Sequence, residues 1–548
     1  MQGENYRMMA RRGRLLVAVL LVAALAGGAR AQAPAFDLKV VEHTLKNGMR
    51  LLLVERHESP TVALYTLFKV GAVNDPQGKT GIAHMLEHMM FKGTPTLGTS
   101  NYKAELPIMD KIDKTHAQLA AELAKRGSPF MKADEEKIKQ LQEEMKRLQQ
   151  EQEKFVVTDE LSQAYERLGG VGTNASTSWD ATDYFLSLPS NQLEVWARIE
   201  SDRMANPVFR EFYPERDVVH EERRLRTDNS PDGLLWERFN ATAFNAHPYR
   251  NPLVGWPSDI DNLTREEVLS YFKTYYSPNN AIVVIVGDIN PAKTIALMEK
   301  YFGKIPPQTI PPRHITDEPD QLGERRVVVE FDAQPDLTIG YHIPASGHDD
   351  TYPLDVMGSL LTGVTRGSRT GRLYRSLVLE KKVALSASAG PFTLNYPGLF
   401  LFNVTPAPGK SVEEVEKAVY EEIEKLQKDL PSPEEMARVR NSVDASMIRA
   451  LRSNMGVARL LASVEHEAGD WKYIFKDIDK SKAVTAEQVR EVARKYFKPQ
   501  NRTVAELRPL AGEEGGESGE GGPPPRPQRV AGIHDLLGEE IPVEGVRQ

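Results

Sequence analysis

His84, Glu87 and His88 are spaced so that they could bind a metal ion and use it for hydrolysis. On a helix, residues four apart lie on one face, so the two imidazole rings can occupy two positions of a tetrahedral zinc site. Glu87 lies beside them and could take a proton from an attacking water. The order is the reverse of the commoner H-E-x-x-H motif. The alternative is a pair of surface histidines on an amphipathic helix.

Apolar neighbours favour the metal site over that alternative. The residues around the motif include Met85, Leu86, Met89, Met90 and Phe91. Polar groups buried among such residues need a partner, and a metal ion would provide one. The chain contains no cysteine. This excludes disulfides, a thiol nucleophile and cysteine-ligated metal, so any metal must be bound by His, Asp or Glu.

A catalytic zinc usually has three protein ligands, and a second segment could supply the third. Its candidates, all between residues 214 and 224, are Glu215, His220, Glu221 and Glu222. On a helix Glu215 and Glu222, seven residues apart, lie almost on one face, whereas Glu221 lies about 100° away. The spacing favours Glu215 and Glu222 as one ligand and one supporting residue, without deciding which is which.

Strand-like segments precede the motif. Residues 40–45, 49–55 and 62–70 are alternating or apolar stretches, and Asn47-Gly48 forms a turn between the first two. A helix is expected from about residue 80, so that the motif follows three strands.

Residues 104 to about 165 differ from the rest of the chain. They are rich in Lys, Glu and Gln, their apolar positions recur at helical spacing, and Gly127-Ser128-Pro129 interrupts them. This predicts a helical hairpin that protrudes as an insertion in its domain. The high charge favours a solvated spacer over a specific docking arm.

Segments 264–280 and 485–501 repeat each other without gaps. The residues that match at an offset of 221 are Thr264 with Thr485, Glu266 with Glu487, Val268 with Val489, Tyr275 with Tyr496, Pro278 with Pro499 and Asn280 with Asn501. Each segment predicts a helix with a capping box, stopped by a proline and followed by a strand. We therefore expect duplicated α/β domains at residues 36–304 and 326–510, joined by a proline-rich linker at 305–325.

The N-terminus has the features of a secretory signal. Three arginines at 11–14 precede an apolar run at 15–26, which is too short to span a bilayer well, and Ala29-Arg30-Ala31 follows. Removal of residues 1–31 as a signal peptide would give an exported protein without a stable membrane span. In a two-membrane bacterium this means the periplasm. The alternative is an uncleaved N-terminal anchor.

Composition limits other functions. The net charge is −8 and no basic stripe stands out, so nucleic-acid binding is not expected. Residues 511–548 are rich in Gly, Glu and Pro, a composition that predicts a disordered tail.

Taken together, these motifs resemble the pitrilysin/insulinase family of inverzincin zinc metallopeptidases, particularly the short members related to mitochondrial processing peptidase. The matching segments are Gly81–Thr94, Asn174–Thr177, Glu215–Glu222, His247–Tyr249, Gly255-Trp256 and Tyr276–Asn280. The resemblance covers about residues 37 to 510. It implies an α+β (α/β sandwich) fold with two homologous duplicated domains. Each would be a mostly antiparallel sheet covered by helices, with the helical hairpin inserted in the first.

The resemblance also implies roles for individual residues. The ligands of one zinc ion per chain would be His84, His88 and Glu222. Glu87 would be the general base, and Glu215 the second acidic residue that supports the site. The strand containing Asn174 and Ala175 would bind an extended peptide through main-chain hydrogen bonds.

The second half departs from the family pattern. The family's oxyanion-stabilising Arg and Tyr fall here on Val378 and Leu385, neither of which can donate a hydrogen bond. One explanation is a homologous partner subunit that supplies the Arg/Tyr pair, or a second copy of this chain. The other is a non-catalytic peptide-binding or assembly subunit. We expect an exported zinc-dependent endopeptidase, the zinc-bearing subunit of a two-chain enzyme, that cleaves peptides or unfolded segments.

Overall fold

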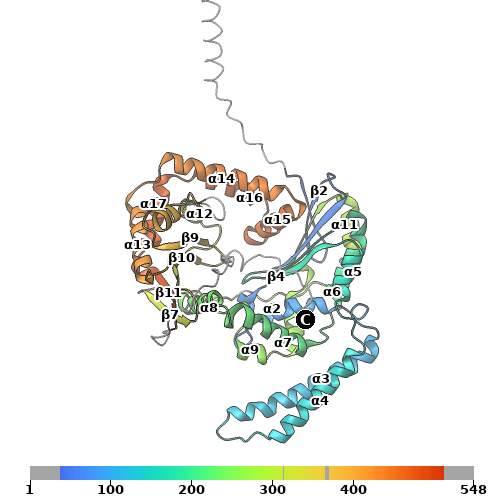
Figure 1. Cartoon of the computed structure of the whole chain (residues 1–548). Coiled ribbons are helices and arrows are strands. Elements are labelled where there is room, and N and C mark those ends of the chain that lie inside the picture. Colours follow the sequence, from blue (N-terminus) through green and yellow to red (C-terminus); the bar gives the residue numbers. More distant parts are fainter. Residues whose placement is uncertain (1–37, 313, 364–368, 511–548) are drawn as a thin grey trace, which may run out of the picture. The chain divides into compact units, whose positions relative to one another are not determined.

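The computed structural model describes residues 38–312, 314–363 and 369–510 (Figure 1). The predicted signal peptide and the predicted C-terminal tail lie outside these ranges. The described residues from Val40 onward form one compact unit. Within the described ranges, no helix is both long and apolar enough to cross a membrane.

The described strands form two sheets. The first has the order β1-β2-β6-β3-β5-β4, built from β1 (Val40–Thr44), β2 (Arg50–Glu55), β3 (Thr61–Phe68), β4 (Val171–Thr177), β5 (Thr182–Pro189) and β6 (Ala281–Gly287). The second has the order β7-β11-β8-β10-β9, built from β7 (Arg325–Phe331), β8 (Asp336–Ile343), β9 (Ala384–Phe392), β10 (Gly398–Pro406) and β11 (Arg502–Pro509).

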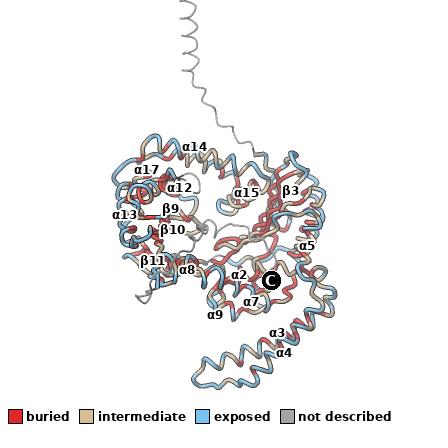
Figure 2. The backbone as a smooth tube through the Cα atoms, viewed as in Figure 1, coloured by how far each residue is buried: buried red, intermediate tan, exposed pale blue. Residues whose placement is uncertain are grey.

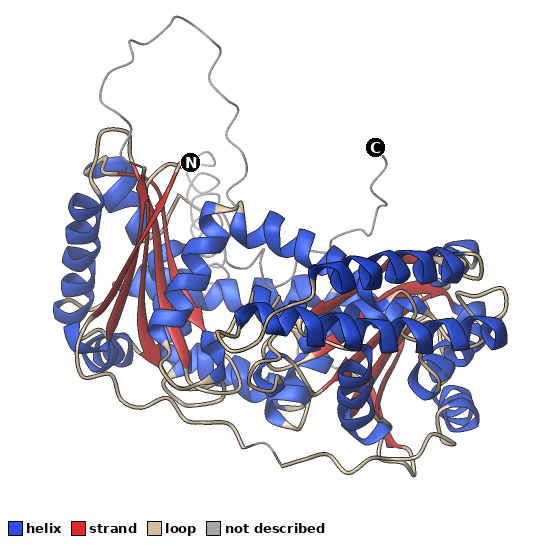
Figure 3. Cartoon of the chain, turned by 90° about the horizontal axis from the view of Figure 1, so that it is seen from below, coloured by secondary structure: helices blue, strands red, loops and turns tan. Residues whose placement is uncertain are grey.

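The two sheets have the same topology once β1 is set aside. In each, the first strand pairs in parallel with the last, and the other pairings are antiparallel. Figure 3 shows both sheets with helices packed against them. The predicted fold class, two duplicated and mostly antiparallel sheets covered by helices, is confirmed.

Helices fill the connections between strands. The first half contains α2 (Ile82–Met89), α3 (Tyr102–Leu123), α4 (Glu135–Glu153), α5 (Glu160–Arg167), α6 (Leu193–Ala205), α7 (Phe212–Arg223), α8 (Pro231–Ala243), α9 (Pro257–Asp261), α10 (Arg265–Tyr275) and α11 (Pro291–Tyr301). The second half contains α12 (Thr351–Thr362), α13 (Val412–Lys428), α14 (Pro433–Leu451), α15 (Asn454–Ala468), α16 (Tyr473–Ala483) and α17 (Ala486–Tyr496). Single π-helical segments occur at Arg224–Asp228 and Tyr374–Glu380.

The sequence repeat corresponds to α10 and α17. Both helices begin with a capping box, from Thr264 to Glu267 in α10 and from Thr485 to Gln488 in α17. Each helix leads into the last strand of its sheet, β6 or β11. The same local signals therefore produce the same helix–strand unit in both halves.

The two halves cover each other's sheets reciprocally. Helix α8 of the first half packs on β7 and β11, and α15 of the second half packs on β3 and β6. These two helices lie at equivalent positions when the offset of 221 is applied. A cluster of buried apolar residues joins the halves, with Trp179 and Phe239 from the first half and Phe392 and Leu507 from the second. Figure 2 shows buried residues concentrated along the strands.

The charged segment at 104–165 contains two long helices that pack against each other. Helices α3 and α4 contact each other along a seam that includes the buried Ile138, Met145 and Leu148 (Figure 1). At the base of the pair, the buried Glu105 forms an ion pair with the buried Arg210, at 3.3 Å. The hairpin is therefore fixed to the loop that precedes α7.

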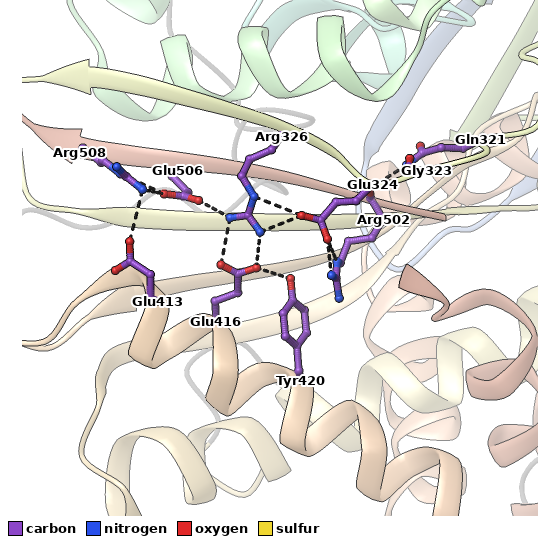
Figure 4. Close-up of polar contacts among 10 residues, drawn as sticks. All are labelled: Gln321, Gly323, Glu324, Arg326, Glu413, Glu416, Tyr420, Arg502, Glu506 and Arg508. Atoms are coloured by element: carbon purple, nitrogen blue, oxygen red, sulfur yellow. Dashed lines mark hydrogen bonds and ion pairs between the residues drawn. The ribbon is translucent and has the colours of Figure 1, made fainter. Parts of the chain in front are cut away.

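The second sheet has an ion network where the first has apolar contacts. Arg326 of β7 pairs with Glu324, with Glu416 of α13 and with Glu506 of β11 (Figure 4). Glu506 is 1% exposed, and its repeat position in β6 is Ile285, which is also fully buried. Arg508 provides Glu506 with a second guanidinium partner. The network thus provides charged partners for the buried carboxylate of Glu506, whose burial without such partners would destabilise the fold.

Candidate metal centre

Helix α2 begins at a point that the chain fixes tightly. Gly81 has φ +85°, and a Cβ there would lie 2.3 Å from the carbonyl oxygen of Val254. The side-chain oxygens of Asp75 accept hydrogen bonds from the backbone N–H groups of Gly81 (2.8 Å) and Ala83 (3.3 Å). These bonds satisfy the first turn, whose N–H groups have no helical partner. The two turns that contain His84 and His88 are thereby anchored at their start.

His84, His88 and Glu222 converge. The Oε2 atom of Glu222 lies 3.5 Å from Nε2 of His84 and 3.2 Å from Nε2 of His88. One ligand atom from each of the three residues lies within 4.8 Å of the others. They come from α2 and α7, which pack against each other. Two imidazoles and one carboxylate are a donor set that catalytic zinc sites use.

The surroundings of these donors fit a bound cation. His84 is 7% exposed, and its Nδ1 atom is buried with no hydrogen-bond partner among the described residues. Burial lowers the pKa of His84, which favours the neutral imidazole that metals bind. The pKa of Glu222 is held below its usual range, because the attraction of His84 and His88 outweighs the effect of burial. The lowered pKa favours the ionised carboxylate, the form that could bind a metal.

Glu215 lies behind His88 instead of among the three donors. Its Oε1 atom is 2.8 Å from Nδ1 of His88, and its Oε2 atom is 2.6 Å from Nζ of Lys92. Burial opposes ionisation of Glu215, but His88 and Lys92 outweigh it and lower its pKa to about 2. Burial would also lower the pKa of His88, but Glu215 and Glu222 raise it to about 10. A carboxylate on the second ring nitrogen fixes the orientation of a ligating imidazole.

The sequence spacing left open which of the two glutamates belongs with the histidines, and the geometry distinguishes them. Glu222 faces both Nε2 atoms, and Glu215 faces Nδ1 of His88. The other candidates in this segment lie apart. His220 pairs with Asp261, and Glu221 pairs with Arg224.

Glu87 projects from the same helix toward β4. The Oγ1 atom of Thr177, the last residue of β4, donates a hydrogen bond to Oε2 of Glu87. Sequence reasoning identified the strand but missed this contact, and it also missed Lys92. Thr177 and Lys92 both lie inside the segments that carried the resemblance. Nothing in the spacing of either residue indicated which side chain it contacts.

Strand β4 is the edge of the first sheet. Among the described strands it pairs only with β5, and it packs against α2. Asn174 and Ala175 lie in its middle and are half-buried, opposite Phe185 and Tyr184 of β5. The side-chain oxygen of Asn174 accepts a hydrogen bond from the N–H of Ala175 (2.9 Å). The outer edge of β4 is the kind of surface to which an extended peptide can add.

Val378 and Leu385 lie in the second half. Val378 is in the π-helical segment Tyr374–Glu380 and packs against the core of the second sheet. Leu385, in β9, is 50% exposed. Both are hydrocarbon side chains and offer no hydrogen-bond donor.

Family models match both halves of the chain. The model described as Insulinase (Peptidase family M16) matches residues 50–122, and the model described as Peptidase M16 inactive domain matches residues 262–443. A Helicobacter pylori protein named zinc protease PqqE is 31% identical over 507 residues. The match covers 90% of this chain and 98% of that protein.

Solved structures agree with these matches. A protease from Helicobacter pylori superposes with a TM-score of 0.71 and 30% identity, over 86% of this chain and all of that one. The first half of the periplasmic protease PqqL from Escherichia coli superposes with a TM-score of 0.63 and 18% identity. That match covers 86% of this chain and 92% of the solved half, and it concerns the fold alone.

Proposed function

Because the chain belongs to the insulinase (pitrilysin-type) family of peptidases, family M16, we propose that it is an exported zinc-dependent endopeptidase that cleaves peptides or unfolded protein segments. The observation that carries this proposal is the convergence of His84, His88 and Glu222 next to Glu87, at the edge of a sheet. The name of the relative from Helicobacter pylori, a zinc protease, supports zinc as the metal.

Each residue of the centre has a distinct task in the proposed reaction. His84, His88 and Glu222 hold the metal, which when bound would act as a Lewis acid toward the substrate carbonyl. Glu87 takes a proton from the attacking water and later returns it to the leaving amine. Glu215, ionised beside Lys92, keeps the Nε2 atom of His88 aimed at the metal.

The substrate would bind as an additional strand on β4. Main-chain hydrogen bonds to Asn174 and Ala175 depend little on the side chains of the substrate, so we expect the protein to accept peptides of many sequences. An extended segment is required, which favours peptides and unfolded regions over folded proteins. The peptide would pass the end of β4, where Thr177 contacts Glu87.

Oxyanion stabilisation calls for a second chain. Val378 and Leu385 have no donors, and loss of one oxyanion donor typically costs ~10²–10³ in rate. We propose that a homologous subunit, or a second copy of this chain, provides them. The solved half of the Escherichia coli protein, similar in fold to nearly this whole chain, supports the idea that the chain corresponds to half of an enzyme. The periplasmic location of the Escherichia coli protein supports the proposal that this chain is exported.

A non-catalytic subunit is the competing function, and one experiment separates the two. Peptide cleavage and bound zinc are measured for the wild type and for Glu87→Gln, each alone and with a homologous partner chain. The proposed enzyme binds zinc in both forms and cleaves only with Glu87 present. A wild type that binds zinc and never cleaves, with or without the partner, supports the non-catalytic subunit. Full activity without a partner contradicts the two-chain arrangement.

A further inference from the structure

Thr177 contacts the side chain of Glu87 through a hydrogen bond. Its hydroxyl donates to Oε2 of the carboxylate, and no other hydrogen bond to Glu87's carboxylate occurs among the described residues. Glu87 is half-buried, so its side chain has room to move. Without a partner, a glutamate with three rotatable bonds samples many orientations. The Thr177 hydroxyl selects one of them and leaves Oε1 free to accept a proton.

The chain holds Thr177 more firmly than it holds Glu87. Thr177 pairs with Thr182 of β5, and the N–H of the next residue, Ser178, donates to the carbonyl of Ala181 (2.8 Å). On the other side, the N–H of Ala72 donates to the carbonyl of Ser178 (3.1 Å). A β-branched side chain on a strand so fixed has few rotamers. The hydroxyl is thus presented at a defined point.

The turn after Thr177 is also a junction between the two halves. Asp180, 5% exposed, accepts hydrogen bonds from the hydroxyl of Tyr249 (2.8 Å) and from the N–H of Asn395 (3.0 Å) in the second half. Trp179 packs edge-on against Phe392 at 5.6 Å. The position of Thr177 therefore depends on contacts between the two halves as well as on the pairing of its own strand.

We propose that Thr177 is a positioning residue that holds the carboxylate of Glu87 in the orientation for proton abstraction and away from the metal. The inference rests on the proposed function and deepens it. Thr177 lies three residues after Asn174 on the strand to which the peptide would add. The same strand, β4, would therefore position both the bound peptide and the carboxylate of Glu87. The orientation of the base is thus coupled to the register in which the peptide pairs with β4.

The test compares two substitutions at this position with a control at a buried threonine of the second sheet. Thr177→Val keeps the shape of the side chain and removes the donor, whereas Thr177→Ser keeps the donor. Thr338→Val is the matched control, because the Thr338 hydroxyl, on β8 of the second sheet, donates to Oδ1 of Asn403 (3.1 Å) and has no part in the proposed site. Each is studied as the full chain, with the partner chain where activity requires it.

For Thr177→Val we expect kcat to fall about tenfold or more, a loss that matches one orienting hydrogen bond, with KM and zinc content unchanged. Thr177→Ser should retain most of kcat. Thr338→Val should lower the melting temperature and leave the kcat of the folded protein unchanged. A wild-type kcat in Thr177→Val overturns the inference, and so does an equal loss in Thr177→Val and Thr177→Ser.

A spectroscopic measurement makes the test independent of turnover. Cobalt(II) replaces zinc, and the visible absorption spectrum reports the coordination of the metal. We expect Thr177→Val to change this spectrum, because the released Glu87 carboxylate can reach the metal. Glu87→Gln in the Thr177→Val background should reverse the change. Identical spectra for the wild type and Thr177→Val overturn the inference. A wild type that binds no metal overturns the proposed function itself.

Discussion

Glu215 and His88 form a direct pair, with Oε1 of the carboxylate 2.8 Å from Nδ1 of the ring. The other oxygen of Glu215 lies 2.6 Å from Nζ of Lys92. The glutamate is thus held at both oxygens, on the side of His88 opposite to Glu222. This geometry supports our proposal that Glu215 orients His88 and does not itself bind the metal.

Removing the charge of Glu215 should therefore weaken metal binding without abolishing it. We expect Glu215→Gln to lower zinc affinity about 10–100-fold, which is typical when such a carboxylate is lost. Competition with a chelator of known affinity measures the change. Glu221→Gln, a charge change on the same helix at a residue paired with Arg224, is the control and should bind zinc normally. Equal affinities in the two variants would contradict the orienting role.

The ion network of the second sheet should contribute to stability. Replacing Arg326 by Met leaves Glu416 and the buried Glu506 with fewer partners, while Arg508 still pairs with Glu506. We expect a loss of roughly 2–3 kcal/mol in the free energy of unfolding, measured by urea denaturation.

The control for that measurement is Arg126→Met, which removes an exposed ion pair with Glu135 near the tip of the hairpin. Exposed pairs contribute little, so this change should destabilise the protein much less than Arg326→Met does. If both substitutions destabilise the protein equally, the network of Figure 4 contributes no more to the free energy of unfolding than an exposed ion pair does.

The pH dependence of stability should include a contribution from Asp336. Burial raises the pKa of this carboxyl group to about 7, and the nearby charge of Asp232 adds to the effect. A pKa that is higher in the folded than in the unfolded state means that the folded protein binds the proton more tightly. The stability from this group is present at low pH and is lost as the pH rises from about 4 through 7.

Asp336→Asn should remove this dependence, because the amide stays neutral and its oxygen can still accept the hydrogen bond from Leu337 N–H (2.7 Å). The variant should be more stable than the wild type at pH 8 and similar to it at pH 4. Thermal unfolding at the two pH values measures this. A variant that is less stable at pH 8 would show that the charged carboxylate is favourable in the folded state.

Local sequence signals predicted the parts of the fold that depend on neighbouring residues. The capping boxes at Thr264 and Thr485 gave equivalent helices, and the spacing of His84 and His88 put both rings on one helical face. Such features follow from helical geometry and from hydrogen bonds within one turn.

Contacts between distant segments could not be predicted in this way. The spacing of Glu215 and Glu222 put both on one face, but only the packing of α7 against α2 distinguishes them. The bond from Thr177 to Glu87 joins residues 90 positions apart. The reciprocal packing of α8 and α15 depends on how two complete sheets assemble. No local sequence pattern predicts this assembly.

The zinc content of the purified chain tests the central claim most directly. Metal analysis after dialysis should find about one zinc per chain in the wild type and in Glu221→Ala, since Glu221 points away from the centre. Glu222→Ala, which removes the one carboxylate that faces both Nε2 atoms, should lose the metal. A wild type without zinc, or a Glu222→Ala variant that retains it fully, would contradict the account.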